Sequence, residues 1–364
     1  MNAPSVLDVA RFNPALESLR GIAALAVCYT HSLAVYRLDG SQAIWAVPIW
    51  QQSPAVAALT AVNALFNPQV AVLLFFVLSG YVLTLSLERQ SIASFYSRRA
   101  LRILPAMWAA LLLTYALNQI DHSGASVSDW YAIDFAQPTL RDLYRNLALI
   151  DFKVSSVTWT IRIELLGSAM MPLFVAALRL RRPWRIAVLV ALIAVVVVTR
   201  TDFRYLLCFY VGALLTQARP RHAWIYLAAG IAVCIALRFS LLEITHSGTA
   251  VLIGTLGGSL LLAGVLCRHF HALETPPVRF LGRVSYSLYL LHPSMLGLAA
   301  ILAFKFTAAP ILGTLMIFAL SIGLSLPMAW ASHRWIELPS MAAGKVVSTA
   351  PWMVRGVGSR TEVQ

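Results

Sequence analysis

Long apolar runs separated by short polar connections dominate the chain. A helix that spans a bilayer needs about 20 consecutive apolar residues. Runs near this length predict ten spans, at about 17–37, 66–87, 102–120, 158–178, 184–199, 204–217, 223–240, 249–267, 283–304 and 310–336. Because the run at 204–217 is short and the run at 310–336 is long, nine or eleven spans remain open. The pattern predicts an all-α polytopic integral membrane protein, a bundle of about ten transmembrane helices.

The composition agrees with this class. Hydrophobic residues make up 59% of the chain and charged residues only 12%, whereas charged residues are about a quarter of a soluble domain. The first sixteen residues have no apolar core and no small-residue cleavage site, so we expect no removable signal peptide. The first span then also serves as the targeting element.

The basic residues set the expected orientation. Most of the 28 lysines and arginines fall in the N-terminus, the C-terminus and every second connection between spans, which predicts that both termini are cytoplasmic. The net charge of +13 is thereby explained by topology and by anionic lipid headgroups, with no nucleic acid as a partner.

One connection, at about 121–157, is long and polar, and on this topology it faces outward. Trp130 and Tyr131 lie beside carboxylates in it, a combination that suits stacking and hydrogen bonding to a sugar. An amphipathic segment that rests on the bilayer surface explains the same residues equally well.

We find no internal repeat in the sequence and expect no soluble extension long enough for a second domain. We expect a transmembrane domain over residues 1–340 and a short basic cytoplasmic tail over 341–364. The cysteines are scattered in apolar runs without a Cys-x-x-Cys pair, which argues against a disulfide framework and against a metal site. They are Cys28, Cys208, Cys234 and Cys267.

Arg20 and His31 lie on one apolar stretch. An ionisable pair inside a span is costly and is therefore interpreted as functional. Their separation of eleven positions places the imidazole roughly 16 Å deeper than the guanidinium, so Arg20 marks a membrane face and His31 lies in the interior. A neutral imidazole there can act as a general base; a hydrogen bond between helices is the alternative.

Glu164 lies about six residues into a span that enters from outside, at a depth close to that of His31. It is expected either to orient the imidazole or to bind hydroxyl groups of a ligand. The alternative is a buried ion pair with Arg162 or another basic group.

Three arginines begin the third span at the cytoplasmic face. Arg98, Arg99 and Arg102 are followed by Pro105, and arginine forks bind phosphates in a bidentate manner. Arg20 lies at the same face and extends the cluster, although Glu17 offers it a plain salt bridge. Topology and lipid headgroups are the alternative explanation for these arginines.

The span that contains His292 is broken by Pro293, which frees a backbone carbonyl and permits a kink. We expect His292 to contact a ligand or to make a packing hydrogen bond. The pair Ser79 and Gly80 indicates close helix packing, and Glu337 is assigned a structural role.

Five motifs in order carry a family resemblance. They are Leu19-Arg20-Gly21 with His31, then Phe75-Phe76 through Tyr81, Arg98-Arg99 through Pro105, Trp159 through Glu164, and Phe280 through His292. Together they resemble the acyltransferase-3 family of bacterial membrane acyltransferases, over about residues 14 to 339.

This resemblance implies a ten-helix bundle in the bacterial inner (plasma) membrane. It implies an O-acetyltransferase that uses cytoplasmic acyl-CoA, usually acetyl-CoA, to acylate a hydroxyl of a cell-surface or lipid-linked glycan. His31 and Glu164 are then the catalytic candidates, and Arg20, Arg98, Arg99 and Arg102 the acyl-CoA site. His292, Tyr289 and Trp159 are candidates for substrate contact, and no metal is implied. Direct transfer and an acetyl-histidine relay would use the same residues.

A secondary transporter or flippase is the alternative from another class. Ionisable residues at the membrane midplane also serve as proton relays in carriers. Consumption of acetyl-CoA distinguishes the two functions.

Overall fold

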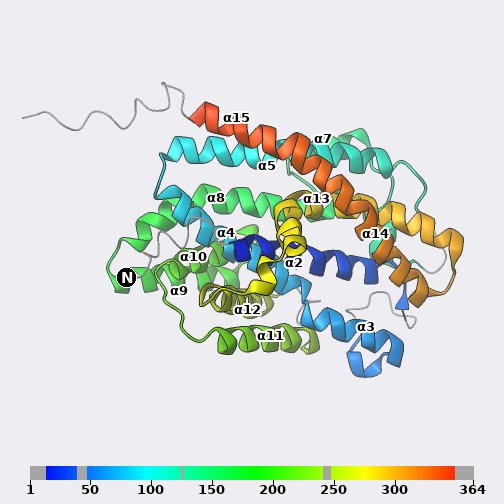
Figure 1. Ribbon diagram of the computed structural model, residues 1–364, viewed down its shortest axis with the longest axis horizontal. Helices are drawn as coiled ribbons and strands as arrows, with labels where there is room; N and C mark the ends of the chain where they lie inside the picture. The colour runs from blue at the N-terminus through cyan, green and yellow to red at the C-terminus, as the bar shows by residue number, and fades with distance from the viewer. Residues whose placement is uncertain (1–13, 39–46, 124–126, 241–246, 349–364) are drawn as a thin grey trace, which may run out of the picture.

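The computed structural model describes residues 14–38, 47–123, 127–240 and 247–348, and these residues form a helical bundle with no strands (Figure 1). Within these residues, an isolated antiparallel β-bridge pairs Tyr36 with Val127. The helices are α2 (Pro14–Leu33), α3 (Pro54–Leu65), α4 (Pro68–Leu87), α5 (Ile92–Leu117), α6 (Asp129–Asp134), α7 (Leu140–Leu147), α8 (Trp159–Leu178), α9 (Arg182–Val198), α10 (Leu206–Leu215), α11 (Ala223–Phe239), α12 (Gly248–Leu266), α13 (Pro276–Phe306), α14 (Pro310–Ser332) and α15 (Leu338–Ser348).

The all-helical, membrane-type architecture expected from the sequence is confirmed. Among the described residues, six helical stretches are long and apolar enough to cross a membrane: Pro54–Leu87, Ile92–Leu117, Ser156–Leu178, Gly248–Leu266, Pro276–Phe306 and Pro310–Ser348. Each of the ten predicted spans overlaps a helix, but α10 has only ten residues. The count of ten crossings and the orientation of the termini stay predictions.

The helix α3 was not foreseen. Its twelve residues, Pro54–Leu65, are too few to span a bilayer alone, and the predicted span began at 66, where Phe66 and Asn67 separate α3 from α4. The Asn67 side chain accepts a hydrogen bond from the amide of Val70, and Pro68 occupies the first turn of α4. These N-terminal signals explain why the helix restarts there.

Helices α2 and α13 run side by side in the same direction. At one end Gly21 meets Gly282, where a Cβ on Gly21 would lie 2.7 Å from the Gly282 nitrogen. At the other end the ring of Tyr36 contacts that of Phe304, with centroids 5.6 Å apart. Small residues let helix backbones approach this closely inside a membrane, so any group on α2 is held at a defined level against α13.

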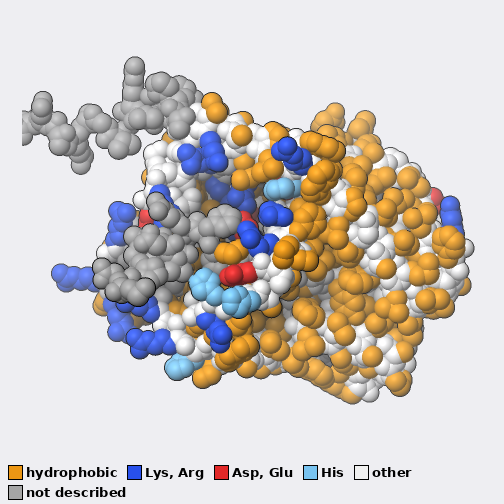
Figure 2. Space-filling view, viewed as in Figure 1, with side chains coloured by type: hydrophobic (Ala, Val, Ile, Leu, Met, Phe, Trp, Pro, Cys, Tyr) orange, Lys and Arg blue, Asp and Glu red, His pale blue; other side chains and the backbone are white. Residues whose placement is uncertain are grey.

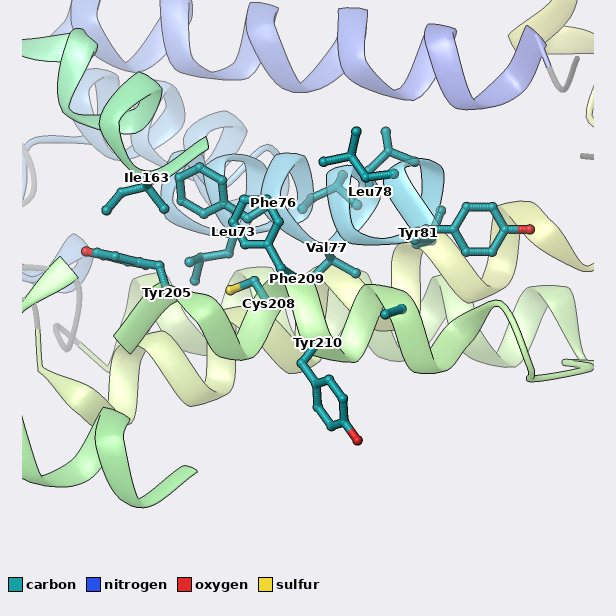
Figure 3. Close-up of a cluster of buried hydrophobic side chains, with 14 of the residues drawn as sticks. Leu73, Phe76, Val77, Leu78, Tyr81, Ile163, Tyr205, Cys208, Phe209 and Tyr210 are labelled. Carbon is teal, nitrogen blue, oxygen red and sulfur yellow. The ribbon is translucent and has the colours of Figure 1, made fainter. Parts of the chain in front are cut away.

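A second close contact joins α4 to α10. A Cβ on Gly80 would lie 2.1 Å from the Phe209 carbonyl oxygen, and one on Gly212 would lie 2.0 Å from that of Val77. Figure 3 shows the apolar cluster around this crossing, in which Phe76 stacks on Phe209 with centroids 5.6 Å apart. The cluster forms a rigid wall beside the site described below.

The long polar connection contains two short helices. Thr139 and Asp142 form a capping box at the start of α7. In α6 and just after it, Tyr131 and Phe135 are buried against α13 and α14, and Trp130 packs at the edge of the same cluster. This connection is therefore folded onto the bundle.

The last helix of the described residues, α15, lies along α5. A π-helical turn, His333–Glu337, connects α14 to α15, and α15 packs on α5 (Figure 1). The buried Glu337 carboxylate accepts from the Ser287 hydroxyl of α13 and lies 3.1 Å from His333 Nδ1. The predicted boundary at residue 340 falls inside α15 and stays a prediction.

Candidate functional site

Three arginines from two helices line one cavity. Arg20 of α2 meets Arg99 and Arg102 of α5 there, and we call this space the arginine cavity. Its remaining wall comes from α4, α5, α8 and α13: Val72, Phe75, Phe76, Ser79, Ile103, Thr160, Ile161, Glu164, Ser285, Tyr286 and Tyr289. The cavity thus combines three cationic side chains with a lining that is largely apolar and aromatic.

The same three arginines also border a second cavity. It is lined in addition by Arg98, Gln90 and Ser86, and by Met341 and Lys345 of α15. Arg98 lines this second cavity and donates from Nε to the Ser348 hydroxyl over 2.8 Å. Basic groups therefore continue from the arginine cavity to the molecular surface.

Figure 2 shows where these charges lie on the molecule. Lys and Arg side chains gather over the half in which α2 begins, while the half in which α13 ends is mostly hydrophobic. We call the first half the arginine end. Such an asymmetry is typical of the cytoplasmic side of a membrane protein.

Glu164 pairs with Arg99. The Arg99 guanidinium donates to the Glu164 carboxylate and, through Nε, to the Ser168 hydroxyl at 3.2 Å. Arg162 instead pairs with Asp202, with Nε and Oδ2 2.6 Å apart. Of the three interpretations left open for Glu164, the structure contains the ion pair with a basic group; its catalytic role stays a prediction.

His292, rather than Glu164, lies in hydrogen-bond contact with His31. Nδ1 of His31 is 2.9 Å from Nε2 of His292, and the two rings stack with centroids 5.0 Å apart. The His292 ring is fully buried. The contact between the two histidines was not predicted from the sequence, because they are 261 positions apart in the chain.

Tyr289 connects the arginine cavity to the histidine pair. Its side chain lines the cavity, and its ring centroid lies 5.6 Å from that of His292, one helical turn further along α13. Trp159, the other aromatic candidate, packs on Phe76 and Tyr205. The cavity wall on α8 is formed by its neighbours Thr160, Ile161 and Glu164.

On the side away from the arginines, Trp130 of α6 covers His31. Their ring centroids are 5.2 Å apart. Beyond it lies an outer cavity lined by Asp121, His122, Tyr131, Phe135 and Gln137, among others. This cavity adjoins α13 near Gly297, five residues past His292.

Two titratable groups of this connection are shifted by burial. Burial lowers the pKa of His122, whose Nδ1 donates to the Ile120 carbonyl at 2.7 Å. Burial raises the pKa of Asp134 to about 6, although the Ser156 hydroxyl donates to its carboxylate at 2.9 Å. Burial thus favours the neutral forms of His122 and Asp134.

Within the described ranges, no group of three His, Cys, Asp or Glu side chains lies together in a way that would hold a metal ion. The four cysteines are free thiols.

The comparison with protein families gives one match. The family model Acyl_transf_3, described as an acyltransferase domain, matches residues 13–330. No curated protein and no solved structure matches the chain with significance. The matched range includes both histidines, all four arginines of the cluster and Glu164, and it ends before α15.

Proposed function

Because the chain belongs to the acyltransferase-3 family of membrane acyltransferases, we propose that it is an O-acetyltransferase that moves an acetyl group from acetyl-CoA to a carbohydrate hydroxyl. One observation carries this proposal. Tyr289 lines the arginine cavity and packs against His292, which is hydrogen-bonded to His31. A candidate anion site and a candidate general base thus lie on either side of one aromatic ring.

The donor would bind at the arginine end. Coenzyme A carries a pyrophosphate and a 3′-phosphate, which guanidinium groups bind well. Arg20, Arg99 and Arg102 line the arginine cavity. Arg98 and Lys345 line the second cavity beside it. Arg99 is already paired with Glu164. Arg20 and Arg102 are therefore the stronger candidates for direct phosphate contact. The apolar wall suits the pantetheine arm and the acetyl group.

The chemistry would take place at His31. Its imidazole accepts the proton of the acceptor hydroxyl while the oxygen attacks the thioester carbonyl. The tetrahedral intermediate collapses, the carbon–sulfur bond breaks, and the imidazolium returns the proton to the departing thiolate of coenzyme A. An acetyl-histidine relay would need the same nitrogen as nucleophile.

The acceptor would approach from the side of α6. Trp130 lies on the His31 ring, and the outer cavity beside it offers carboxylate, imidazole and amide groups next to aromatic rings. Aromatic faces flanked by such polar groups suit a sugar. A glycan of the cell surface or one linked to lipid fits this position, with the protein in a bacterial inner membrane and its arginine end in the cytoplasm.

The test is transfer of labelled acetyl from acetyl-CoA into membrane glycans. Membranes that carry the wild-type chain should incorporate label, and His31→Ala should abolish incorporation at matched expression. The control is His269→Ala, because His269 is an exposed histidine on a connecting segment. Equal incorporation by wild type and His31→Ala would remove His31 from the chemistry. Consumption of no acetyl-CoA by the wild-type chain would overturn the enzymatic function.

A further inference from the structure

The backbone of α13 contains an unusual acceptor next to the histidine pair. Pro293 lies inside the helix and has no N–H, so the carbonyl of Tyr289, four residues earlier, has no helical donor from that position. An unsatisfied carbonyl inside a membrane is costly. A side chain that can donate is therefore expected near it.

His292 supplies this donor. Its Nδ1 lies 2.7 Å from the Tyr289 carbonyl oxygen. A carbonyl oxygen only accepts, so Nδ1 of His292 carries a proton. Full burial in an apolar bundle favours the neutral ring, and a neutral ring protonated at Nδ1 has an unprotonated Nε2.

That Nε2 is the atom that faces His31. Because an unprotonated nitrogen accepts, Nδ1 of His31 must be the donor across the 2.9 Å contact. A neutral His31 that is protonated at Nδ1 leaves its Nε2 lone pair unprotonated. For two neutral rings, no other placement of protons satisfies both hydrogen-bond contacts.

We propose that His292 is a positioning residue that fixes the tautomer of His31, so that Nε2 of His31 is the proton-accepting atom. The carbonyl freed by Pro293 fixes the tautomer of His292 in turn. The inference rests on the proposed function for its catalytic meaning, but the proton placement itself is a property of the resting protein. The proposal gives His292 an indirect role in the reaction, through His31, in place of the predicted contact with the substrate.

The direct test is solid-state nitrogen NMR of the full chain labelled with ¹⁵N-histidine and reconstituted in lipid. Signals of the two rings are assigned with His31→Asn and His292→Asn. We expect His31 in the wild type to be protonated at Nδ1 and unprotonated at Nε2. A wild-type His31 protonated at Nε2 overturns the proposal.

Two variants extend this measurement. Pro293→Ala gives the Tyr289 carbonyl a backbone donor that competes with His292, so we expect the fixed tautomers to become mixed. Pro327→Ala, which changes a proline inside α14, is the matched control and should leave the histidine signals unchanged. Unmixed tautomers in Pro293→Ala would contradict the role of the freed carbonyl.

Kinetics distinguish positioning from packing. His292→Phe should lower kcat for acetyl transfer by about 100-fold, the lower end of a general-base contribution, with KM for acetyl-CoA unchanged within about twofold. His292→Gln should recover part of that loss, because an amide oxygen can replace Nε2 as the acceptor for His31. Equal activity of both variants and wild type would overturn the proposal. A correct tautomer in a chain that transfers no acetyl would instead refute only the proposed function.

Discussion

Arg99 on α5 and Glu164 on α8 form an ion pair in the wall of the arginine cavity, with side chains only 14% and 17% exposed. The pair holds one of three cavity arginines in place and neutralises it. Its position separates Glu164 from the histidine contact and ties it to the expected anion site.

Glu164→Gln therefore tests which role the carboxylate has. The amide still accepts from Arg99 but carries no charge, so the cavity becomes more positive. We expect KM for acetyl-CoA to fall at least about twofold and kcat to change less than about tenfold. Steady-state kinetics on the purified full chain measure both constants. A fall in kcat of about 100-fold or more would return Glu164 to the catalytic step.

Trp130→Ala should separate the acceptor side from the donor side. Removal of the indole leaves the arginine cavity intact but deprives His31 of its aromatic cover. We expect acetyl incorporation into glycans to fall about tenfold, the loss of a good aromatic contact. Hydrolysis of acetyl-CoA by water should stay within about twofold. Trp50→Ala changes an exposed tryptophan and is the matched control; an equal loss in both reactions would place Trp130 outside the acceptor site.

Gly80→Ala should destabilise the bundle. Its Cβ would meet the Phe209 backbone, and neither helix can yield without disturbing the cluster around Phe76. Overpacking of this kind costs about 1–3 kcal/mol. Gly323→Ala on α14 is the matched control, because nothing lies within 4 Å of its Cβ, and helix propensity favours alanine there. Thermal unfolding in detergent should show a lower Tm for the first variant alone.

Asp134→Asn should raise stability at neutral pH. The pKa of Asp134 is near 3.8 in the unfolded chain and about 6 in the folded one, so the folded state binds the proton more tightly. Stability is then lost as pH rises from about 4 to about 6, by up to about 3 kcal/mol. The variant should exceed wild type in Tm by more at pH 7.5 than at pH 4.5. The same difference at both values would contradict a buried carboxylate.

The sequence predicted what depends on one helix alone. The level of His31 relative to Arg20 follows from the rise per residue, and three arginines within five residues share one end of α5 whatever surrounds them. Of these arginines, Arg99 and Arg102 line the arginine cavity with Arg20, while Arg98 lines the neighbouring one.

The same reasoning could not predict which residues of neighbouring helices contact one another. Similar depth made Glu164 a candidate partner for His31, but depth does not fix which face of which helix a residue shares. The partner is His292, and its contact depends on the packing of α13 against α2. Pro293 was the sequence signal that could have indicated the role of His292. A proline leaves the carbonyl four residues earlier without a helical donor, and His292 directly precedes this proline in the chain.

The contact between Gly21 and Gly282 sets a common reference level for α2 and α13. His31 lies ten positions after Gly21 and His292 ten positions after Gly282. Two parallel helices of equal pitch therefore place both rings at the same level, about 15 Å along the axis from the glycine contact. One residue inserted into either helix between glycine and histidine would turn its ring by about 100° and raise it by about 1.5 Å relative to the other. The equal spacing within the two helices is what brings the rings of His31 and His292 into contact.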